Sequence, residues 1–485
     1  METALFSTLT AAFIGICAAF FASKRSFWGR TLLLSFSAVP LCVPALIVAL
    51  GYVSFFGVNG TASSLVKVIS GENSRGFTFL YSSTGIILAQ GFYNFPFVTG
   101  ILTDYWSRLP KNEENAARLC GASEGRVFFT VTLPRLGGAI GAACIPVFLF
   151  CFFSFMIVML FSPVGKSTLE VELYHAIRTT LNLQSAAAYA IIETLFALAI
   201  VFAYSFIIKQ NQKHSAGTAF LENPRFPLAK APFSSKTSRL LEVIFFISIF
   251  VLVLLFFCAP ALSIVVSALH QKRGGMEFWT FAQFSTLFKN QNFWKAFLNS
   301  ILVGFSTAFA CALFGFIWAL FVKLSGHQES PFFQTMPLLP MSISSVVISW
   351  VATMIFHKGN VFLLVLLQTF LYWPIAYRQI QNGINSIPAD TDKAARLLSK
   401  GYFDSVIRVY LPSCRKFIIS GFAYSFAVSL GDATLPLVLS IPKFDTLALY
   451  VYKLASSYRF NQACACGIIL TFICLALFSL SRSAK

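Results

Sequence analysis

Two ionisable side chains lie within long apolar stretches, where a charge is costly and usually serves a function. Glu193 falls in the stretch 187–208, and Asp432 falls in the stretch 417–440. A charged residue at the centre of a membrane helix costs about 2.5–3.5 kcal/mol on insertion scales. Both are therefore candidates for contact with a solute that crosses the membrane, and a structural contact between helices is the alternative. Three amides in other apolar stretches are their polar companions: Gln90, Asn94 and Gln368.

The segment 165–168 resembles the end of a phosphate-binding loop, but it lacks the rest of that motif. It reads Gly-Lys-Ser-Thr, and the motif needs a second glycine five residues before Gly165, where this chain has Leu160. The eleven cysteines and five histidines show no metal-ligand or disulfide spacing. We therefore expect no nucleotide site, no metal, no cofactor and no catalytic site within the chain.

Composition indicates that the elements positioning these residues are membrane helices. The chain is 57% hydrophobic and 11% charged, whereas soluble domains carry about 25% charged residues. Apolar runs of this length in lipid must be helical, because the backbone has to satisfy its own hydrogen bonds. We predict an all-α integral membrane protein with eleven spans, at about 3–22, 32–56, 78–102, 138–162, 187–208, 242–268, 297–322, 332–356, 360–380, 417–440 and 463–481.

The net charge of +18 is distributed unevenly between the two sides of these spans. If the loop 23–31 faces the cytoplasm, the loops on that side hold 24 of the 36 Lys and Arg residues, and the opposite loops hold 12. This is the positive-inside bias of membrane proteins. It predicts an N-terminus outside and a C-terminus in the cytoplasm. It also makes lipid, rather than nucleic acid, the expected surroundings.

A loop of the predicted cytoplasmic side occurs twice, with a separation of 278 residues. Ala-Ala-Arg-Leu at 116–119 and a later Leu-Pro at 133–134 recur at 394–397 and 411–412. Matches at the same separation continue into the flanking apolar stretches and outer loops. The chain therefore reads as two tandem halves of five and six spans. We expect a first half at 1–208, a polar linker at 209–238 and a second half at 239–485.

The spacing of this loop resembles the cytoplasmic signature of type I ABC importer permeases: Ala-Ala, three residues, Gly, nine residues, an aliphatic residue, one residue, Leu-Pro. Two departures stand out: the family's leading Glu is Asn115 or Lys393 here, and its Gly is Ser399 in the second copy. The matching positions are Ala116, Ala117, Gly121, Val131, Leu133 and Pro134 in the first copy, and Ala394, Ala395, Ser399, Val409, Leu411 and Pro412 in the second.

The resemblance implies that each loop forms a short coupling helix that docks on a cytoplasmic ABC ATPase subunit. It also implies two such ATPase subunits, which hydrolyse the ATP, and a periplasmic or lipid-anchored substrate-binding protein. The permease would then be a multi-pass protein of the bacterial inner membrane and not itself an enzyme. In this interpretation, Gly121 allows a left-handed helix stop, and Pro134 marks a turn before the next membrane helix.

Two fused halves resemble the thiamine and the ferric-iron branches of this superfamily. The run Ser429-Leu-Gly-Asp432 and the later Thr446-Leu-Ala-Leu-Tyr450 favour the thiamine branch. The resemblance implies thiamine or thiamine phosphates as the substrate, with ferric iron as the alternative. Carboxylates and aromatic faces suit the thiamine cation. The candidate pathway residues are Asp432, Glu193, Gln90, Gln368, Tyr93 and Trp373.

An ion-gradient-driven carrier remains an alternative of a different class. Such a carrier should place acidic ion sites at membrane depth in both halves, but the first-half position equivalent to Asp432 is Ser154. Co-purification with an ATPase subunit would separate the two classes.

Overall fold

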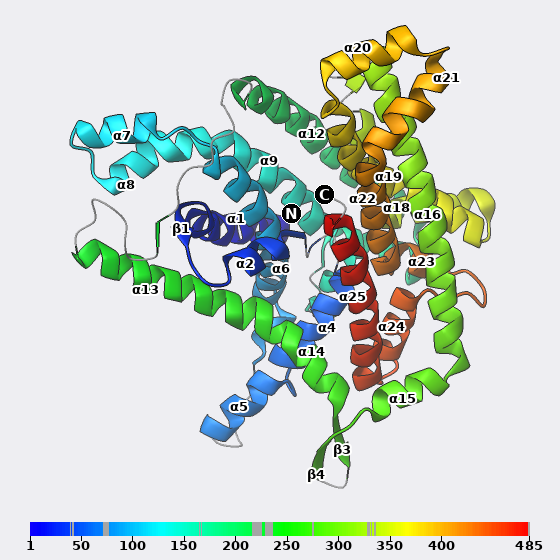
Figure 1. Ribbon diagram of the computed structural model, residues 1–485. Coiled ribbons are helices and arrows are strands. Elements are labelled where there is room, and N and C mark those ends of the chain that lie inside the picture. Colours follow the sequence, from blue (N-terminus) through cyan, green and yellow to red (C-terminus); the bar gives the residue numbers. More distant parts are fainter. Residues whose placement is uncertain are drawn as a thin grey trace. The chain divides into compact units, whose positions relative to one another are not determined.

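The computed structural model describes the chain except residues 39, 41–42, 71–76, 164, 166, 216–225, 228–235, 274–275, 327–329, 331, 334–335 and 484–485. Helices make up nearly all of its regular structure, which confirms the expected all-α class (Figure 1). Four short strands occur in the described residues, as two pairs: β1 (Arg25–Ser26) with β2 (Phe226–Pro227), and β3 (His270–Arg273) with β4 (Met276–Trp279).

The long helices follow the same order from α1 (Glu2–Lys24) in the first half and from α16 (Gln291–Leu324) in the second. In the first half the helices are α1 (Glu2–Lys24), α2 (Arg30–Ser35), α4 (Ala45–Phe56), α5 (Thr61–Ser70), α6 (Ser83–Ser107), α7 (Asn112–Leu119), α8 (Glu124–Val127), α9 (Leu133–Phe152), α10 (Phe155–Phe161), α11 (Leu169–Arg178) and α12 (Leu183–Ser215). In the second half they are α13 (Lys236–Val253), α14 (Ala259–Leu269), α15 (Ala282–Lys289), α16 (Gln291–Leu324), α18 (Ser345–Phe356), α19 (Val361–Asn385), α20 (Ala389–Leu398), α21 (Tyr402–Ser405), α22 (Leu411–Gly431), α23 (Thr434–Leu439), α24 (Leu447–Ser456) and α25 (Phe460–Ser483). Single turns of 3₁₀ or π type are η1 (Phe36–Ala38), η2 (Phe79–Tyr81), η3 (Phe128–Thr132), η4 (Leu254–Cys258), η6 (Met336–Ser342) and η7 (Val406–Tyr410).

The predicted count of eleven spans is not confirmed. Among the described residues, nine helices are long and apolar enough to cross a membrane, or up to ten if the bent pair of η6 and α18 is one span. The predicted span 417–440 is missing from this set. It corresponds to α22 and α23, which are separated at Asp432, and α22 carries the adjacent charges Arg415 and Lys416 in its second turn. These charges and several serines lower its mean hydropathy.

Contacts divide the chain into two compact units that each combine several segments. Unit 1 contains 1–40, 51–169 and 199–263, and unit 2 contains 41–50, 170–198 and 264–485. The predicted boundaries of the sequence halves, 1–208 and 239–485, stay a prediction. Most of the predicted linker 209–238 lies outside the described residues.

In unit 1, α1 packs along α6 because small residues let the two helices approach closely. A Cβ atom at Gly15 would lie 2.7 Å from the Val98 side chain. Near the outer part of this contact, the Ser7 hydroxyl donates to Gln90 Oε1 over 2.8 Å. The long helix of the second half completes this unit, since rings of α13 and η4 pack on those of α1 and α6.

In unit 2, α16 packs along α19 through an equivalent contact. A Cβ atom at Gly315 would lie 2.9 Å from the Tyr377 nitrogen, and the Thr307 hydroxyl donates to Gln368 Oε1 over 3.1 Å. The serine–glutamine and threonine–glutamine bonds therefore occupy the same place in the two halves. Helix α22 packs against both α16 and α19, and α25 packs against α22.

These matched contacts explain why the separation between equivalent residues of the two halves is not constant towards the start of each half. Ser7 and Gly15 match Thr307 and Gly315 at a separation of 300, whereas Gln90 matches Gln368 at 278. The first half therefore has 22 more residues between these helices, and α5 and η2 lie in that interval. Helices α6 and α19 then begin in register, because Ser82 and Asn360 each cap the first turn of their helix.

Candidate functional site

The first repeated loop contains a short helix, α7, which ends in a left-handed residue as predicted. Gly121 has φ +84°, its nitrogen donates to the Arg118 carbonyl over 2.9 Å, and the Ala122 nitrogen donates to the Ala117 carbonyl over 3.1 Å. This pair of bonds is the Schellman pattern of a helix stop. Ala116 is exposed and Ala117 is half-buried, so the small face of α7 is open for contact.

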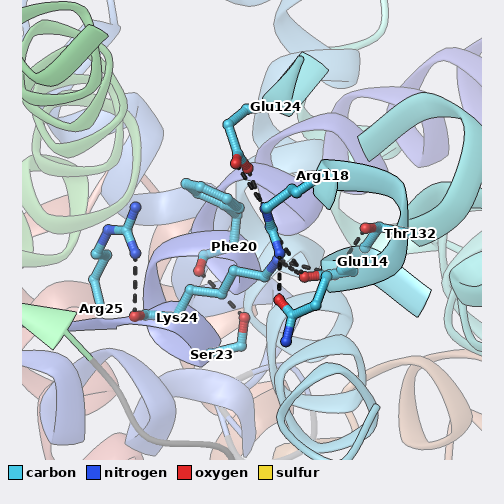
Figure 2. Close-up of polar contacts among 9 residues, drawn as sticks. Phe20, Ser23, Lys24, Arg25, Glu114, Arg118, Glu124 and Thr132 are labelled. Carbon is cyan, nitrogen blue, oxygen red and sulfur yellow. Dashed lines mark hydrogen bonds and ion pairs between the residues drawn. The ribbon is translucent and has the colours of Figure 1, made fainter. Parts of the chain in front are cut away.

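A buried carboxylate fixes α7 against the end of α1 (Figure 2). Glu114 is only 7% exposed, and each of its two oxygens lies 3.0 Å from Lys24 Nζ. Thr132 Oγ1 donates to Glu114 Oε1 over 2.8 Å, and Arg118 reaches Oε2 at 3.4 Å. Arg118 also pairs with Glu124 of α8 at 2.7 Å. The first loop is therefore held by a network of charges.

Opposing effects act on the pKa of Glu114. Burial raises the pKa of its carboxyl, but the charge of Lys24, the Thr132 hydrogen bond and the charge of Arg118 outweigh burial and hold the pKa below its usual range. Glu114 is therefore ionised at neutral pH.

The second repeated loop contains α20 and α21, which connect α19 to α22 (Figure 1). Its helix ends differently from α7: Ser399 has extended backbone angles, φ −80° and ψ 147°, and its hydroxyl donates to the Ala395 carbonyl. The absence of the family's glycine is therefore compatible with this loop, because no left-handed residue is needed at that point. Ala394 is exposed, while Ala395 is buried.

Large apolar side chains on the second loop are exposed. Leu397 and Leu398 are 84% and 86% exposed, and Tyr402 and Phe403 are 77% and 78% exposed. The equivalent residues of the first loop are Leu119, Cys120, Glu124 and Gly125. The second loop thus presents a much more apolar surface, of the kind that marks a protein-binding site when it is exposed to water.

Each repeated loop leads into the next long helix through a π-helical turn. Val131 lies in η3 and Val409 in η7, and Leu133-Pro134 and Leu411-Pro412 begin α9 and α22. Pro134 therefore does not mark a separate turn as expected. It occupies the first positions of α9, where its missing N–H is tolerated. π-helical turns are rare and often occur at functional sites.

The acidic residue that is important in each loop lies one position before the one that the family's signature predicts. That signature places its Glu at 115 and 393, whereas Glu114 and Asp392 are the residues that face inwards. The Asp392 carboxylate accepts a hydrogen bond from the Tyr410 hydroxyl, as Glu114 does from Thr132. Glu114 matches Asp392, and Thr132 matches Tyr410, at the separation of 278. This match in the sequence could have identified the two acids.

The predicted pathway residues of unit 1 make structural polar contacts. Gln90 accepts from Ser7 and donates to the Cys151 carbonyl over 3.4 Å. The Tyr93 hydroxyl donates to the Pro40 carbonyl over 3.0 Å. These bonds hold α6 to neighbouring segments, and they leave the role of both residues in a pathway a prediction.

In unit 2 the structure brings Asp432 and Gln368 together. Gln368 Nε2 donates to Asp432 Oδ2 over 3.3 Å, and the other carboxylate oxygen accepts from the backbone nitrogens of Thr434 and Leu435 at 2.9 and 3.2 Å. Asp432 therefore caps the start of α23, which supports the structural alternative for this residue. Trp373 packs its ring against Trp318, with the ring centres 6.2 Å apart.

Glu193 lies beside a second acid that sequence reasoning did not single out. Glu193 of α12 and Glu170 of α11 are both buried in unit 2, with exposed fractions of 1% and 0%. Burial and the neighbouring Glu193 carboxyl hold the pKa of Glu170 well above its usual range. The second-half equivalents of these acids are Ala448 and Thr471, so the pair of acids occurs in the first half alone.

Comparison with known proteins identifies a transport family. The chain is 23% identical to the thiamine transport system permease protein ThiP of Escherichia coli K12, covering 94% of this chain and 82% of that protein. It is 24% identical to the ThiP of Brucella abortus strain 2308, covering 100% and 86%. A putative 2-aminoethylphosphonate transport system permease protein, PhnV of Salmonella paratyphi A, is 24% identical, over 48% of this chain and 92% of its own length.

The family model for the binding-protein-dependent transport system inner membrane component matches twice, at residues 11–214 and 330–484. The two matches include both repeated loops and the helices on either side of them. They also agree with the apolar helices of the structure. The chain therefore belongs to the family of binding-protein-dependent transport system inner membrane components, as a permease with two fused halves.

Proposed function

We propose that this chain is the membrane-spanning subunit of an ATP-driven importer for thiamine or its phosphates. The observation that carries the proposal is the similarity to thiamine permeases over nearly the whole chain, in both halves. A half-length relative of another substrate class matches only about half of the chain. The full-length match to thiamine permeases therefore favours thiamine over the substrate of that half-length relative.

Two cytoplasmic ABC ATPase subunits supply the energy in this proposal. One binds α7 and α8 of the first loop, and the other binds α20 and α21 of the second. Exposed small and apolar side chains support this, because docking needs surface that is free in the permease alone. The positive-inside bias puts both loops in the cytoplasm, the N-terminus outside and the C-terminus inside.

A charge on each docking helix tests this assignment. Ala116→Asp and Ala394→Asp should separate ATP hydrolysis from transport, because the new carboxylate would be buried without a partner at the ATPase surface. The measurement is the ATPase activity and the uptake of the reconstituted importer. Wild-type transport in both variants would refute the docking role of these loops.

A periplasmic or lipid-anchored binding protein delivers the substrate from the other side of the membrane. The outer segments around α11 and α24 are the proposed receiving surface, since they are equivalent in the two halves. Within the membrane, Asp432, Glu193, Gln90, Gln368, Tyr93 and Trp373 stay proposed pathway residues. A carboxylate with aromatic faces would favour a cation such as thiamine.

Uptake of labelled thiamine at low concentration is the decisive test of the substrate. A bacterium that lacks this gene should lose the uptake, and the cloned gene should restore it. Unchanged thiamine uptake together with a growth defect under iron limitation would favour the ferric-iron alternative. Transport without any associated ATPase subunit would favour an ion-gradient carrier.

A further inference from the structure

The same contact between an acid and a hydroxyl occurs in both repeated loops. In the first, Thr132 Oγ1 donates to Glu114 Oε1 over 2.8 Å. In the second, the Tyr410 hydroxyl donates to Asp392 Oδ1. The acid lies on the docking helix in each case, and the hydroxyl lies on the last residue of the π-helical turn. We call these two contacts the acid–hydroxyl pairs.

The residue types of the two pairs differ in a way that preserves the contact. The longer acid, Glu114, meets the shorter hydroxyl side chain, Thr132. The shorter acid, Asp392, meets the longer one, Tyr410. A change in the reach of one partner is therefore offset by the other, which indicates that the distance between the docking helix and the π-helical turn matters in both halves.

Both hydroxyl groups belong to side chains that are fully or almost fully buried. Thr132 is 2% exposed and Tyr410 is 0% exposed. Hydrogen bonds to a carboxylate are stronger than bonds between neutral groups, and they gain strength away from water. Each pair joins the docking helix to the residue that immediately precedes a long helix, α9 or α22.

We propose that the acid–hydroxyl pairs transmit movement of the docking helices to α9 and α22. Thr132 and Tyr410 are then positioning residues for transport, and neither contacts the ATPase or the substrate. Without its pair, a docking helix could shift with its ATPase while the π-helical turn absorbs the movement. This inference rests on the proposed binding of ATPase subunits to the docking helices, and it names the residues that would transmit their movement.

The test removes each hydroxyl while preserving the side-chain volume. Thr132→Val and Tyr410→Phe should leave ATPase binding and ATP hydrolysis within about twofold of wild type, because the exposed docking surface is unchanged. Thiamine uptake should fall about tenfold, the effect expected when one bond to a charged group is lost. Thr132→Ser should restore uptake, since it keeps the hydroxyl.

Two exposed residues supply matched controls. Thr130→Val removes a hydroxyl in the same π-helical turn, where Thr130 bonds only within its own helix. Tyr458→Phe removes the hydroxyl of a tyrosine that is 98% exposed. Both controls should transport as the wild type does. Uptake within twofold of the controls in both Thr132→Val and Tyr410→Phe would overturn the proposal, as would loss of ATPase binding.

A second readout separates failure of this inference from failure of the proposed substrate. Hydrogen–deuterium exchange of η3 and η7 in the assembled complex should change when a nonhydrolysable ATP analogue is added, and this change should disappear in Thr132→Val and Tyr410→Phe. If the wild type takes up no thiamine but shows this change, only the substrate assignment fails. If the exchange of η3 and η7 in both variants responds to the ATP analogue as it does in the wild type, transmission through the pairs is refuted.

Discussion

The two docking loops share their spacing and an acid–hydroxyl contact, but they differ in the side chains around that contact. In the first, Glu114 lies among Lys24, Arg118 and Thr132, so charges fix α7. In the second, Asp392 accepts from Tyr410, and the position equivalent to Lys24 is Leu324. The second loop instead exposes leucines and aromatic side chains. Duplicated loops can therefore keep one spacing while the helix stop and the exposed side chains differ.

The largest expected difference between the loops concerns ATPase binding. Leu397→Asp with Leu398→Asp should weaken binding of the ATPase about a thousandfold, measured by co-purification, because two buried apolar anchors at about 2 kcal/mol each contribute about 4 kcal/mol. The equivalent pair, Leu119→Asp with Cys120→Asp, should weaken it about tenfold or less. Equal losses would show that the apolar surface of the second loop does not dominate binding.

The second prediction concerns the stability of the first loop. Lys24→Met should destabilise it by about 2 kcal/mol, because the buried Glu114 carboxylate loses its closest cation, while Arg118 lies farther away at 3.4 Å. The matched change in the other half, Leu324→Met, should cost less than about 1.5 kcal/mol since it conserves volume. Rates of limited proteolysis within 108–135 measure the effect. No change in the Lys24→Met variant would refute the charge network as the stabilising force.

The stability of the first loop should depend on pH through Glu114. The pKa of Glu114 is depressed in the folded state, so its stabilisation is present above the unfolded-state pKa of about 4.3 and is lost as the pH falls through the lower folded value. Acid should therefore accelerate proteolysis of the first loop. In Glu114→Gln the acceleration of proteolysis that comes from protonating Glu114 should disappear. A variant whose proteolysis rate depends on pH as the wild type's does would contradict the prediction.

The smallest expected effect compares the two helix stops. Gly121→Ala should destabilise the first loop by about 1 kcal/mol, because φ is +84° there and an L side chain is strained. No atom lies within 4 Å of the added Cβ, so backbone strain acts alone. Ser399→Gly should change stability by less than about 0.5 kcal/mol. A larger effect at Ser399 than at Gly121, measured by thermal unfolding, would reverse the comparison.

Local patterns in the sequence were enough to predict much of this protein. Apolar runs predicted the membrane helices, and the Ala-Ala and Leu-Pro spacing predicted two docking loops with a glycine stop in the first. The count of eleven spans is not confirmed, because Arg415 and Lys416 lower the mean hydropathy of α22 and α23 is a separate helix. Before Gln90 the separation between equivalent residues changes from 278 to 300, and the sequence alone does not explain this change. The matched helix contacts show that it comes from 22 additional residues around α5.

The sequence by itself determined the class, the duplication and the docking loops, because these depend on periodicity, composition and spacing along the chain. Only the tertiary structure decided which polar groups meet. It placed Glu114 on Lys24 and Thr132, Asp432 on Gln368, and Glu193 beside Glu170. Each of these contacts joins residues from separate helices or turns. Its formation depends on how those elements pack, which no local pattern of residues specifies.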